Sequence, residues 1–295
     1  MHHFQVPRLL IALLFTLIAS SCAVTPPARH SGQTNDVGAF VADARTQVSV
    51  VGAPRVLAVF DLDNTLLAME QGLGSDQWYE WQKEQHAHEP CDPRVVGDRL
   101  AVQGALYFAS AMRPTQPDAP ELLRELQDLN VPVIALTSRG VDFRLQTFRE
   151  LRRNGYDFRR SALSPEAGWP DDFVPDNGIR PVRYEDGVFL TTGQHKGAML
   201  DALLRKTGAE MPSVILMLDD KQTNLDAIHE TFDPMGVAVR SWRYTGEDGL
   251  VAGFDPEASD RLWQQAAPAL DSLQQVFGAD HYDLNGAMHK SGCTD

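Results

Sequence analysis

Two aspartates that are two positions apart, Asp61 and Asp63, directly follow the apolar run at residues 56–60. Side chains at positions i and i+2 of an extended chain point to the same side, so the two carboxylates can face one space. Their mutual repulsion and burial would raise the pKa of one of them unless a cation lies between them. With a divalent cation in that place, Asp61 can stay ionised as a nucleophile and Asp63 can exchange a proton.

Two other interpretations of this Asp-x-Asp pattern can be compared with its surroundings. An EF-hand calcium loop needs a glycine at its sixth position and an acidic residue at its twelfth. Counted from Asp61, these positions hold Leu66 and Gly72, so the spacing excludes such a loop. The second interpretation is a short acidic match that merely caps a helix. The apolar run before Asp61, together with two further segments of the same kind, argues against it.

Those segments belong to a set of three continuous apolar runs, at residues 56–60, 131–136 and 214–218. Such runs are typical of strands that are buried on both faces of a parallel sheet, and helical patterns lie between them as crossover connections require. The second run ends at Thr137 and Ser138, and the third ends at Asp219 and Asp220. Because open parallel sheets build their sites at the carboxyl ends of the strands, we expect one α/β domain with these side chains at one edge.

Insertions and a C-terminal extension surround this core. Residues 68–117 predict a small helical cap, and the segment 165–194 contains Asp186-Gly187 between apolar residues, which predicts a short β-hairpin. A further strand is predicted at 236–240, and apolar residues at helical spacing over 262–277 predict a helix that packs on the sheet. We place the folded domain at residues 49–278 and a C-terminal tail at 279–295.

The first residues have the organisation of an export signal. Arg8 precedes a short apolar run, small residues and Cys22. The run is about half the length that a membrane-spanning helix needs, so residues 1–21 predict a secretory signal peptide. They also resemble a bacterial lipoprotein signal, which implies a lipid on Cys22 and a tether and N-terminal segment at 22–48. The expected location is the periplasm, anchored to the outer membrane, or alternatively a soluble secreted or periplasmic state after simple cleavage.

Charge and cysteine content limit the partners. The formal net charge of −14 argues against nucleic acid, because binding its backbone depends on cations that neutralise phosphates. A phosphate-binding site must therefore depend on a local metal ion and backbone N–H groups. Besides Cys22 the chain has only Cys91 and Cys293, which are too few and too far apart for a zinc site. In an oxidising compartment they can pair, and the sequence leaves a disulfide and two free thiols equally open.

Taken together, the motifs resemble those of the haloacid-dehalogenase superfamily, in the family's order, over residues 54–245. The segment 61–65 (Asp-Leu-Asp-Asn-Thr) is similar to its first motif, and 135–139 is similar to its second. Lys196 is similar to the third-motif lysine, and 218–224 resembles the acidic fourth motif. The segment from Gly74 to Trp78 resembles an uncharacterised bacterial branch of exported proteins. The resemblance implies a three-layer α/β/α Rossmann-like core with a parallel sheet.

The resemblance also implies an activity, the magnesium-dependent hydrolysis of a small phosphate monoester. Asp61 would attack phosphorus and form an aspartyl-phosphate, which divides one difficult displacement into two steps. Asp63 would protonate the leaving oxygen and then take a proton from the attacking water. Thr137 and the backbone N–H of Ser138 would hold phosphate oxygens, while Lys196 would neutralise charge on Asp61 and the phosphoryl group.

For the metal, the resemblance implies Mg²⁺ held by the Asp61 carboxylate, the Asp63 backbone carbonyl and Asp220. Asp219 would either ligate directly or orient the other groups from behind them. Asn224 lies where many relatives carry an acid, so its role is left open.

Other functions stay open. A phosphotransferase would differ only in its acceptor alcohol. A dehalogenase would share Asp61, but the phosphatase members are the ones that carry a second aspartate, as Asp63 is here. A non-catalytic exported scaffold is disfavoured because unused buried acids are costly. Two further features have two interpretations each. Arg139 would contact substrate or form a surface salt bridge, and Trp78 and Trp81 would pack the cap or stack on a leaving group.

Overall fold

The computed structural model describes residues 30–277 and residue 293. The predicted signal peptide at 1–21, Cys22 and the tail at 279–295, apart from Cys293, lie outside the described residues. None of the helices described between residues 30 and 277 is both long enough and apolar enough to span a membrane.

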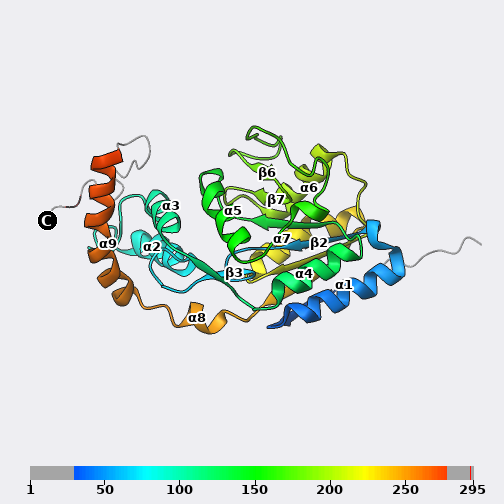
Figure 1. Cartoon of the computed structure of the whole chain (residues 1–295), viewed down its shortest axis with the longest axis horizontal. Coiled ribbons are helices and arrows are strands. Elements are labelled where there is room, and N and C mark those ends of the chain that lie inside the picture. Colours follow the sequence, from blue (N-terminus) through cyan, green and yellow to red (C-terminus); the bar gives the residue numbers. More distant parts are fainter. Residues whose placement is uncertain (1–29, 278–292, 294–295) are drawn as a thin grey trace, which may run out of the picture.

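A central sheet of seven strands organises the described part of the chain (Figure 1). Its order is β1-β9-β8-β2-β5-β7-β6, and all neighbours are parallel except β6 and β7. The strands are β1 (His30–Thr34), β2 (Val56–Phe60), β5 (Val133–Thr137), β6 (Arg183–Glu185), β7 (Val188–Leu190), β8 (Val214–Asp219) and β9 (Ala238–Tyr244). The three predicted apolar runs form the adjacent strands β8, β2 and β5, so the predicted parallel α/β core is confirmed.

Helices cover both faces of the sheet and give three layers (Figure 1). One face carries α1 (Val37–Val51), α4 (Ala119–Asp128) and α5 (Arg144–Arg153), and the other carries α6 (Lys196–Thr207) and α7 (Gln222–Phe232). Alternate residues of β2 enter the two cores: Val56, Ala58 and Phe60 pack on one side, and Leu57 and Val59 on the other. Because both faces are buried, the strand is apolar throughout.

The folded domain begins earlier than the predicted boundary at residue 49. β1 pairs in parallel with β9 over its whole length. Asp36 then caps α1 by accepting a hydrogen bond from the backbone N–H of Gly38, and Phe40 is fully buried in the core. The assignment of 22–48 to a tether and N-terminal segment is therefore wrong for residues 30–48. β1 is a polar edge strand whose side chains are half-buried or exposed, so its sequence carries no apolar run.

The predicted hairpin is present and extends the sheet. β6 and β7 are antiparallel, and β7 also pairs in parallel with β5. At the turn, Asp186 and Gly187 have φ angles of 45° and 77°. Two consecutive positive φ angles are what the tightest hairpin turn requires, and Asp-Gly adopts them readily. The hairpin thereby sets the chain that follows it, residues 191–195, beside the end of β5.

The insertion between β2 and β5 is helical, as predicted for the cap. A small antiparallel pair, β3 (Leu67–Met69) and β4 (Met112–Pro114), joins it to the core. Its helices are α2 (Asp76–His88) and α3 (Arg99–Ala109). Trp78 is buried between them, which agrees with the packing interpretation of that residue.

The C-terminal helix packs on the cap and not on the sheet, which corrects the prediction. After α8 (Asp248–Ala252), α9 (Pro256–Phe277) runs beside α2 and α3 (Figure 1). Trp263 and Leu270 join Leu73 and Val102 in the cap core, so the cap is built from two distant parts of the chain. The sheet is already covered on both faces, and helical periodicity identifies the buried face of a helix but not the element that covers it.

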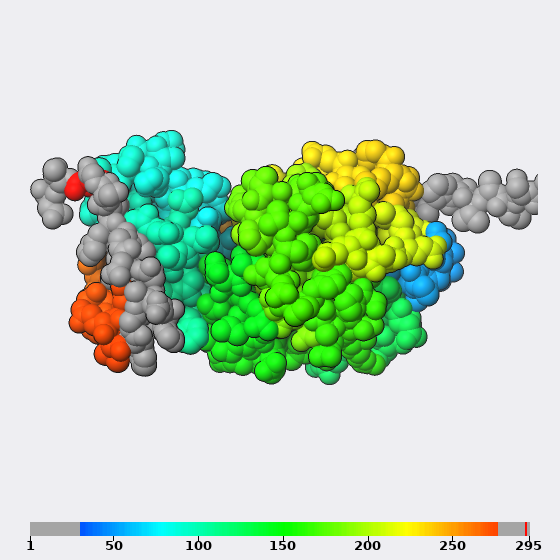
Figure 2. Space-filling view, turned by 90° about the horizontal axis from the view of Figure 1, so that it is seen from above, coloured from blue at the N-terminus to red at the C-terminus, as the bar shows by residue number. Residues whose placement is uncertain are grey.

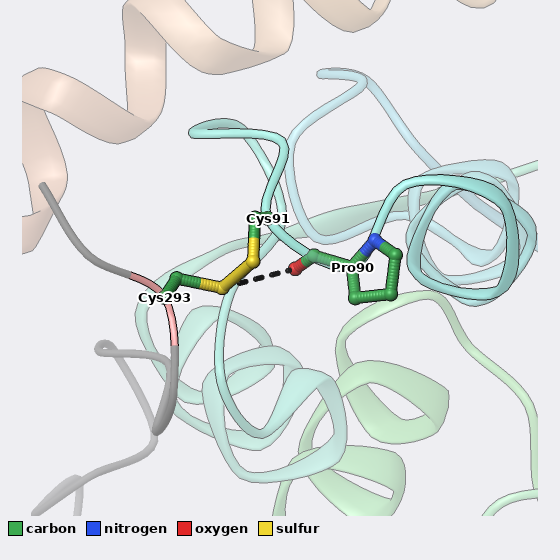
Figure 3. The surroundings of a disulfide bond; sticks show 3 residues. All are labelled: Pro90, Cys91 and Cys293. Carbon is green, nitrogen blue, oxygen red and sulfur yellow. Dashed lines mark hydrogen bonds between the residues drawn. A yellow bond between two sulfur atoms is a disulfide. The ribbon is translucent and has the colours of Figure 1, made fainter.

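A disulfide joins Cys91, in the loop between α2 and α3, to Cys293 (Figure 3). The two Cα atoms are 5.6 Å apart although 202 positions separate the residues in sequence. The Cys293 sulfur also lies 3.9 Å from the carbonyl oxygen of Pro90 (Figure 3). The pairing that the sequence left open is therefore present, and it joins Cys293 to the cap.

Replacement of both Cys91 and Cys293 by serine is expected to lower the free energy of unfolding by about 2–4 kcal/mol, because the crosslink restricts a long loop of the unfolded chain. Urea denaturation followed by circular dichroism measures the change. Reduction of the unsubstituted protein should bring its stability down to that of the double variant. Equal stability of the oxidised protein and the variant would contradict the prediction.

Candidate active site

Adjacent strands bring the predicted acidic and hydroxyl side chains to one edge of the sheet. Asp61 directly follows β2, Thr137 ends β5 and Asp219 ends β8. The backbone N–H of Asp61 donates to the carbonyl of Leu218, 2.9 Å away, which continues the β2–β8 ladder to the site. Asp61 is 5 % exposed and Asp219 is completely buried, so these carboxylates need partners.

Lys196 supplies the positive charge between these two acids. Its Nζ lies 2.5 Å from Asp61 Oδ1 and 2.7 Å from Asp219 Oδ2. Burial opposes the ammonium form, but the two carboxylates outweigh it and raise the pKa of Lys196 above its ordinary value. Lys196 is the first residue of α6, and the His195 side chain caps that helix by accepting from the N–H of Ala198. The helix start therefore fixes where the ammonium lies.

Gly197 allows α6 to approach α7 closely, and this places Lys196, the residue before it, beside Asp61 and Asp219. A Cβ atom at Gly197 would lie only 2.0 Å from the backbone oxygen of Ala227. Gly197→Ala is therefore expected to lower the free energy of unfolding by about 3 kcal/mol and to move Lys196 from the acids. Urea denaturation measures the loss of stability.

Gly104→Ala in α3 is the matched control for Gly197→Ala, because the nearest atom to its new Cβ is 3.9 Å away. That change should raise stability by up to about 1 kcal/mol, and equal losses in both variants would contradict the role given to Gly197.

Asp219 accepts three hydrogen bonds. Besides Lys196 on Oδ2, its Oδ1 accepts from the backbone N–H of Lys221 and from the Asn224 side-chain amide, both at 2.9 Å. The open question about Asn224 is thereby answered in structural terms, because its amide orients Asp219. A carboxylate held by three donors is suited to positioning other groups and leaves little capacity for a further ligand.

Asp220 has the opposite character. Side-chain oxygens of Asp61, Asp219 and Asp220 all lie within 4.8 Å of one another. The Asp220 backbone N–H donates to Thr65 Oγ1 at 2.9 Å, but its carboxylate accepts no hydrogen bond from any described residue. Asp61 Oδ2 is similarly underused, with only Thr65 Oγ1 at 3.5 Å. Two carboxylates of one cluster, those of Asp61 and Asp220, therefore keep oxygens with little or no hydrogen bonding to the described residues.

The electrostatics of this cluster show a shortage of positive charge. Burial raises the pKa of Asp61 to about 7, aided by the nearby charge of Asp219 and opposed by Lys196. Burial also raises the pKa of Asp220 to about 9, with further contributions from Asp61 and Asp219. A divalent cation would relieve both shifts, and a donor set made only of oxygens suits Mg²⁺. The residues present therefore fit that metal.

The Asp63 carboxylate has a partner of its own. Arg139 Nε and Nη2 donate to its two oxygens at 2.9 and 2.8 Å, and the Tyr107 hydroxyl donates at 3.0 Å. Burial alone would raise the pKa of Asp63, but the guanidinium outweighs it and lowers that pKa below its usual range. The Asp63 side chain thus lies outside the acid cluster, and its counter-ion is an arginine, which corrects the expectation of one cation between Asp61 and Asp63.

Arg139 is 6 % exposed and pairs with Asp63, so its interpretation as a surface salt bridge is wrong. Its only signal in the sequence is its place directly after the second motif. Tyr107 had no signal at all, because it belongs to the apolar pattern of α3 in the cap and reaches Asp63 only through the fold. Its ring also lies 5.0 Å from the Arg139 guanidinium, which steadies the pair.

The segment after β5 is held by the chain that follows the hairpin. Thr191 Oγ1 donates to the carbonyl of Thr137 at 2.8 Å, and the N–H of Gly193 donates to the carbonyl of Ser138 at 2.8 Å. Thr137 is fully buried, and its hydroxyl accepts from the N–H of Arg139. Ser138 is exposed, which leaves it accessible to a bound phosphate.

A cleft of about 540 Å³ opens above the site, lined by Asp63 and Ser138 from the core and by α2 and α3 of the cap. Figure 2 shows the cap and the core as two adjoining lobes. Lys221 connects them, since its Nζ lies 2.9 Å from Asp76 and 3.2 Å from Glu80, both on α2. Asp63 thus lines a cleft between the core and the cap, while Asp61, Asp219 and Asp220 are not among its lining residues.

The model of a family described as "Protein of unknown function (DUF2608)" matches residues 31–273. No curated protein matches the chain. The matched range starts within β1, in agreement with a folded domain that begins near residue 30. It also contains the acid cluster, Lys196 and the whole cap including most of α9.

Proposed function

This chain belongs to the DUF2608 family of proteins of unknown function, and we propose that it is a magnesium-dependent phosphohydrolase that acts on phosphate monoesters. The observation that carries the proposal is the buried Asp61 carboxylate, which Lys196 holds through Oδ1 and which clusters with Asp219 and with Asp220, whose carboxylate has no hydrogen-bond partner among the described residues. A nucleophile fixed by a cation, beside oxygen donors that can hold a divalent ion, is an arrangement suited to phosphoryl transfer.

Mg²⁺ would be held by the carboxylates of Asp61 and Asp220 together with the Asp63 backbone carbonyl. Asp219 would orient the site through Lys196, because its own oxygens are already hydrogen-bonded. The bound ion would neutralise charge on the phosphoryl group and on the acid cluster.

Asp61 would attack phosphorus through Oδ2, whose single hydrogen bond within residues 30–277 is the long one from Thr65. The bond from Asp61 oxygen to phosphorus forms as the bond to the leaving oxygen breaks, and water later hydrolyses the aspartyl-phosphate. Lys196 holds Oδ1 throughout, so the carboxylate keeps its direction. Ser138, and the chain that holds it, would bind the phosphate oxygens opposite the acids.

Asp63 would take the proton of the attacking water, a role that suits a carboxylate kept ionised by Arg139. To protonate the leaving oxygen, Asp63 must first hold a proton. This requires Arg139 to give up at least one of its two hydrogen bonds to the Asp63 carboxylate. A phosphate bound beside Ser138 supplies the anion that competes for this guanidinium, because Arg139 follows Ser138 directly and lines the same cleft.

Export remains part of the proposal. The Cys91–Cys293 disulfide supports it, because such bonds persist in oxidising compartments. A lipid on Cys22 would be the only link to a membrane that we propose.

Release of inorganic phosphate from a panel of aryl, sugar and nucleoside phosphates tests the activity, with Mg²⁺ or with a chelator. We expect turnover with the metal and none with the chelator. Phosphate found on an added alcohol would identify a phosphotransferase instead, and halide release from a haloacid would favour the dehalogenase. Tight Mg²⁺ binding without turnover on any ester would contradict the proposal.

A further inference from the structure

The charges that line the cleft do not balance. Basic side chains lining it are Lys83, Arg99, Arg139, Arg180 and Lys221, and its acids are Asp63, Asp76 and Glu80. The ion pairs are Arg139 with Asp63, Lys221 with Asp76 and Glu80, and Lys83 with Glu80. Within residues 30–277 every acid of the cleft is therefore neutralised, while Arg99 and Arg180 have no acidic partner. In a chain of net charge −14, two arginines without an acidic partner thus line one cleft, Arg99 half-buried and Arg180 exposed.

Arg99 belongs to the cap. Its guanidinium lies over the ring of Tyr79, with 5.1 Å between the guanidinium carbon and the ring centroid. Its Nε is buried and has no hydrogen-bond partner among the described residues. A buried donor without a partner is costly unless a ligand satisfies it, so this side chain is placed for a bound acceptor.

Arg180 also lines the cleft, and it belongs to the segment before the hairpin of the core. Its backbone N–H donates to Gln194 Oε1 at 3.1 Å, which fixes the segment before the hairpin. Its Nη1 lies beside Gly193, where a Cβ atom would be only 3.6 Å from it. Since the N–H of Gly193 holds the carbonyl of Ser138, the guanidinium lies near the expected phosphate position without belonging to the acid cluster.

We propose that Arg99 and Arg180 bind a second anionic group on the leaving-group side of the substrate, either a carboxylate or a second phosphate. This inference rests on the proposed function. Guanidinium groups bind both anions through paired, charge-assisted hydrogen bonds. The cleft, at about 540 Å³, has room for a leaving group of that kind beyond the transferred phosphate. Because one cation lies on the cap and one on the core, such a substrate would join the two lobes.

Three esters of equal chain length test this: n-propyl phosphate, the same ester with a terminal carboxylate, and the same ester with a terminal phosphate. With Mg²⁺ present, kcat/KM is expected to be at least about 10-fold higher for a terminal anion, the effect of one charged hydrogen bond. Arg99→Met and Arg180→Met should each bring that ratio close to one. Lys83→Met, whose charge is already paired with Glu80, should keep it. The two anionic esters compared with each other show whether carboxylate or phosphate is preferred.

A preference that survives both arginine substitutions, or no preference in the unsubstituted protein, would overturn the inference. Hydrolysis of none of the three esters would count against the proposed function instead. In that case isothermal titration of the same esters still decides the inference, because tighter binding of the anionic esters must depend on Arg99 and Arg180. Circular dichroism of each variant confirms that the fold is intact.

Discussion

Asp61→Asn is expected to reduce phosphate release by roughly a thousandfold or more, because an amide cannot attack phosphorus in place of the carboxylate. The substitution keeps the size of the side chain, and the amide oxygen can still accept from Lys196 Nζ. Initial rates on the best ester of the panel, at saturating Mg²⁺, measure the effect. The loss should lie in kcat, because the interaction removed forms only during the reaction.

Stability provides the first control for this variant. The pKa of Asp61 is raised to about 7 because its carboxylate is buried near Asp219, so loss of its charge should not unfold the protein. Asp43→Asn is the matched control for removing a half-buried, paired acid elsewhere. Asp43 lies on α1, with Arg240 at 2.8 Å and the Trp242 indole N–H at 2.9 Å. That variant should lose stability but keep its turnover. Full activity of Asp61→Asn would exclude Asp61 as the nucleophile.

The parts of the site that the sequence predicted are those carried by strands. β2, β5 and β8 are apolar throughout because both faces are buried, and this makes their ends easy to locate. The residues at those ends, Asp61, Thr137 and Asp219, therefore meet where a parallel sheet brings them. Lys196 was found by its place in the order of motifs, although a single lysine before a helix has no distinguishing local pattern.

The parts that were missed depend on contacts between distant segments. Tyr107 lies 44 positions from Asp63 on the apolar face of a cap helix, so only the docking of the cap reveals its hydrogen bond. Arg139 could be assigned to solvent or to a ligand, and the fold instead placed it against Asp63. α9 presents an apolar face that would fit either the sheet or the cap. Local periodicity does not show which element a helix packs against. That choice depends on the shape of the surface that the rest of the fold leaves uncovered.

Contacts between the cap and the core also connect the cap to the candidate site. Tyr107 on α3 and the acids of α2 reach the core at Asp63 and Lys221, which are next to or within the site. Arg99, in the same cap, faces the cleft from above. A substrate that fills the cleft therefore contacts both lobes, because residues of both line it.

Lys196→Met should have the largest effect on stability, a loss of about 3–5 kcal/mol in the free energy of unfolding. The substitution keeps an unbranched side chain but leaves Asp61 and Asp219 buried together with no ammonium between them. Turnover should also be lost, since the nucleophile is no longer held. Urea denaturation in the absence of metal measures the stability, and Lys83→Met, at an exposed ion pair, should change it little.

The double variant Lys196→Met/Asp219→Asn separates charge from packing. If the loss comes from two unpaired carboxylates, removing one of the charges should restore a good part of the stability while turnover stays absent. Mg²⁺ should likewise stabilise the single variant more than the unsubstituted protein, because the ion would supply the positive charge that the acids lack. A single variant that unfolds at the same urea concentration as the unsubstituted protein would contradict this account. It would mean that Asp61 and Asp219 are not both charged in the folded state, and Asp61 would then need the metal to become a nucleophile.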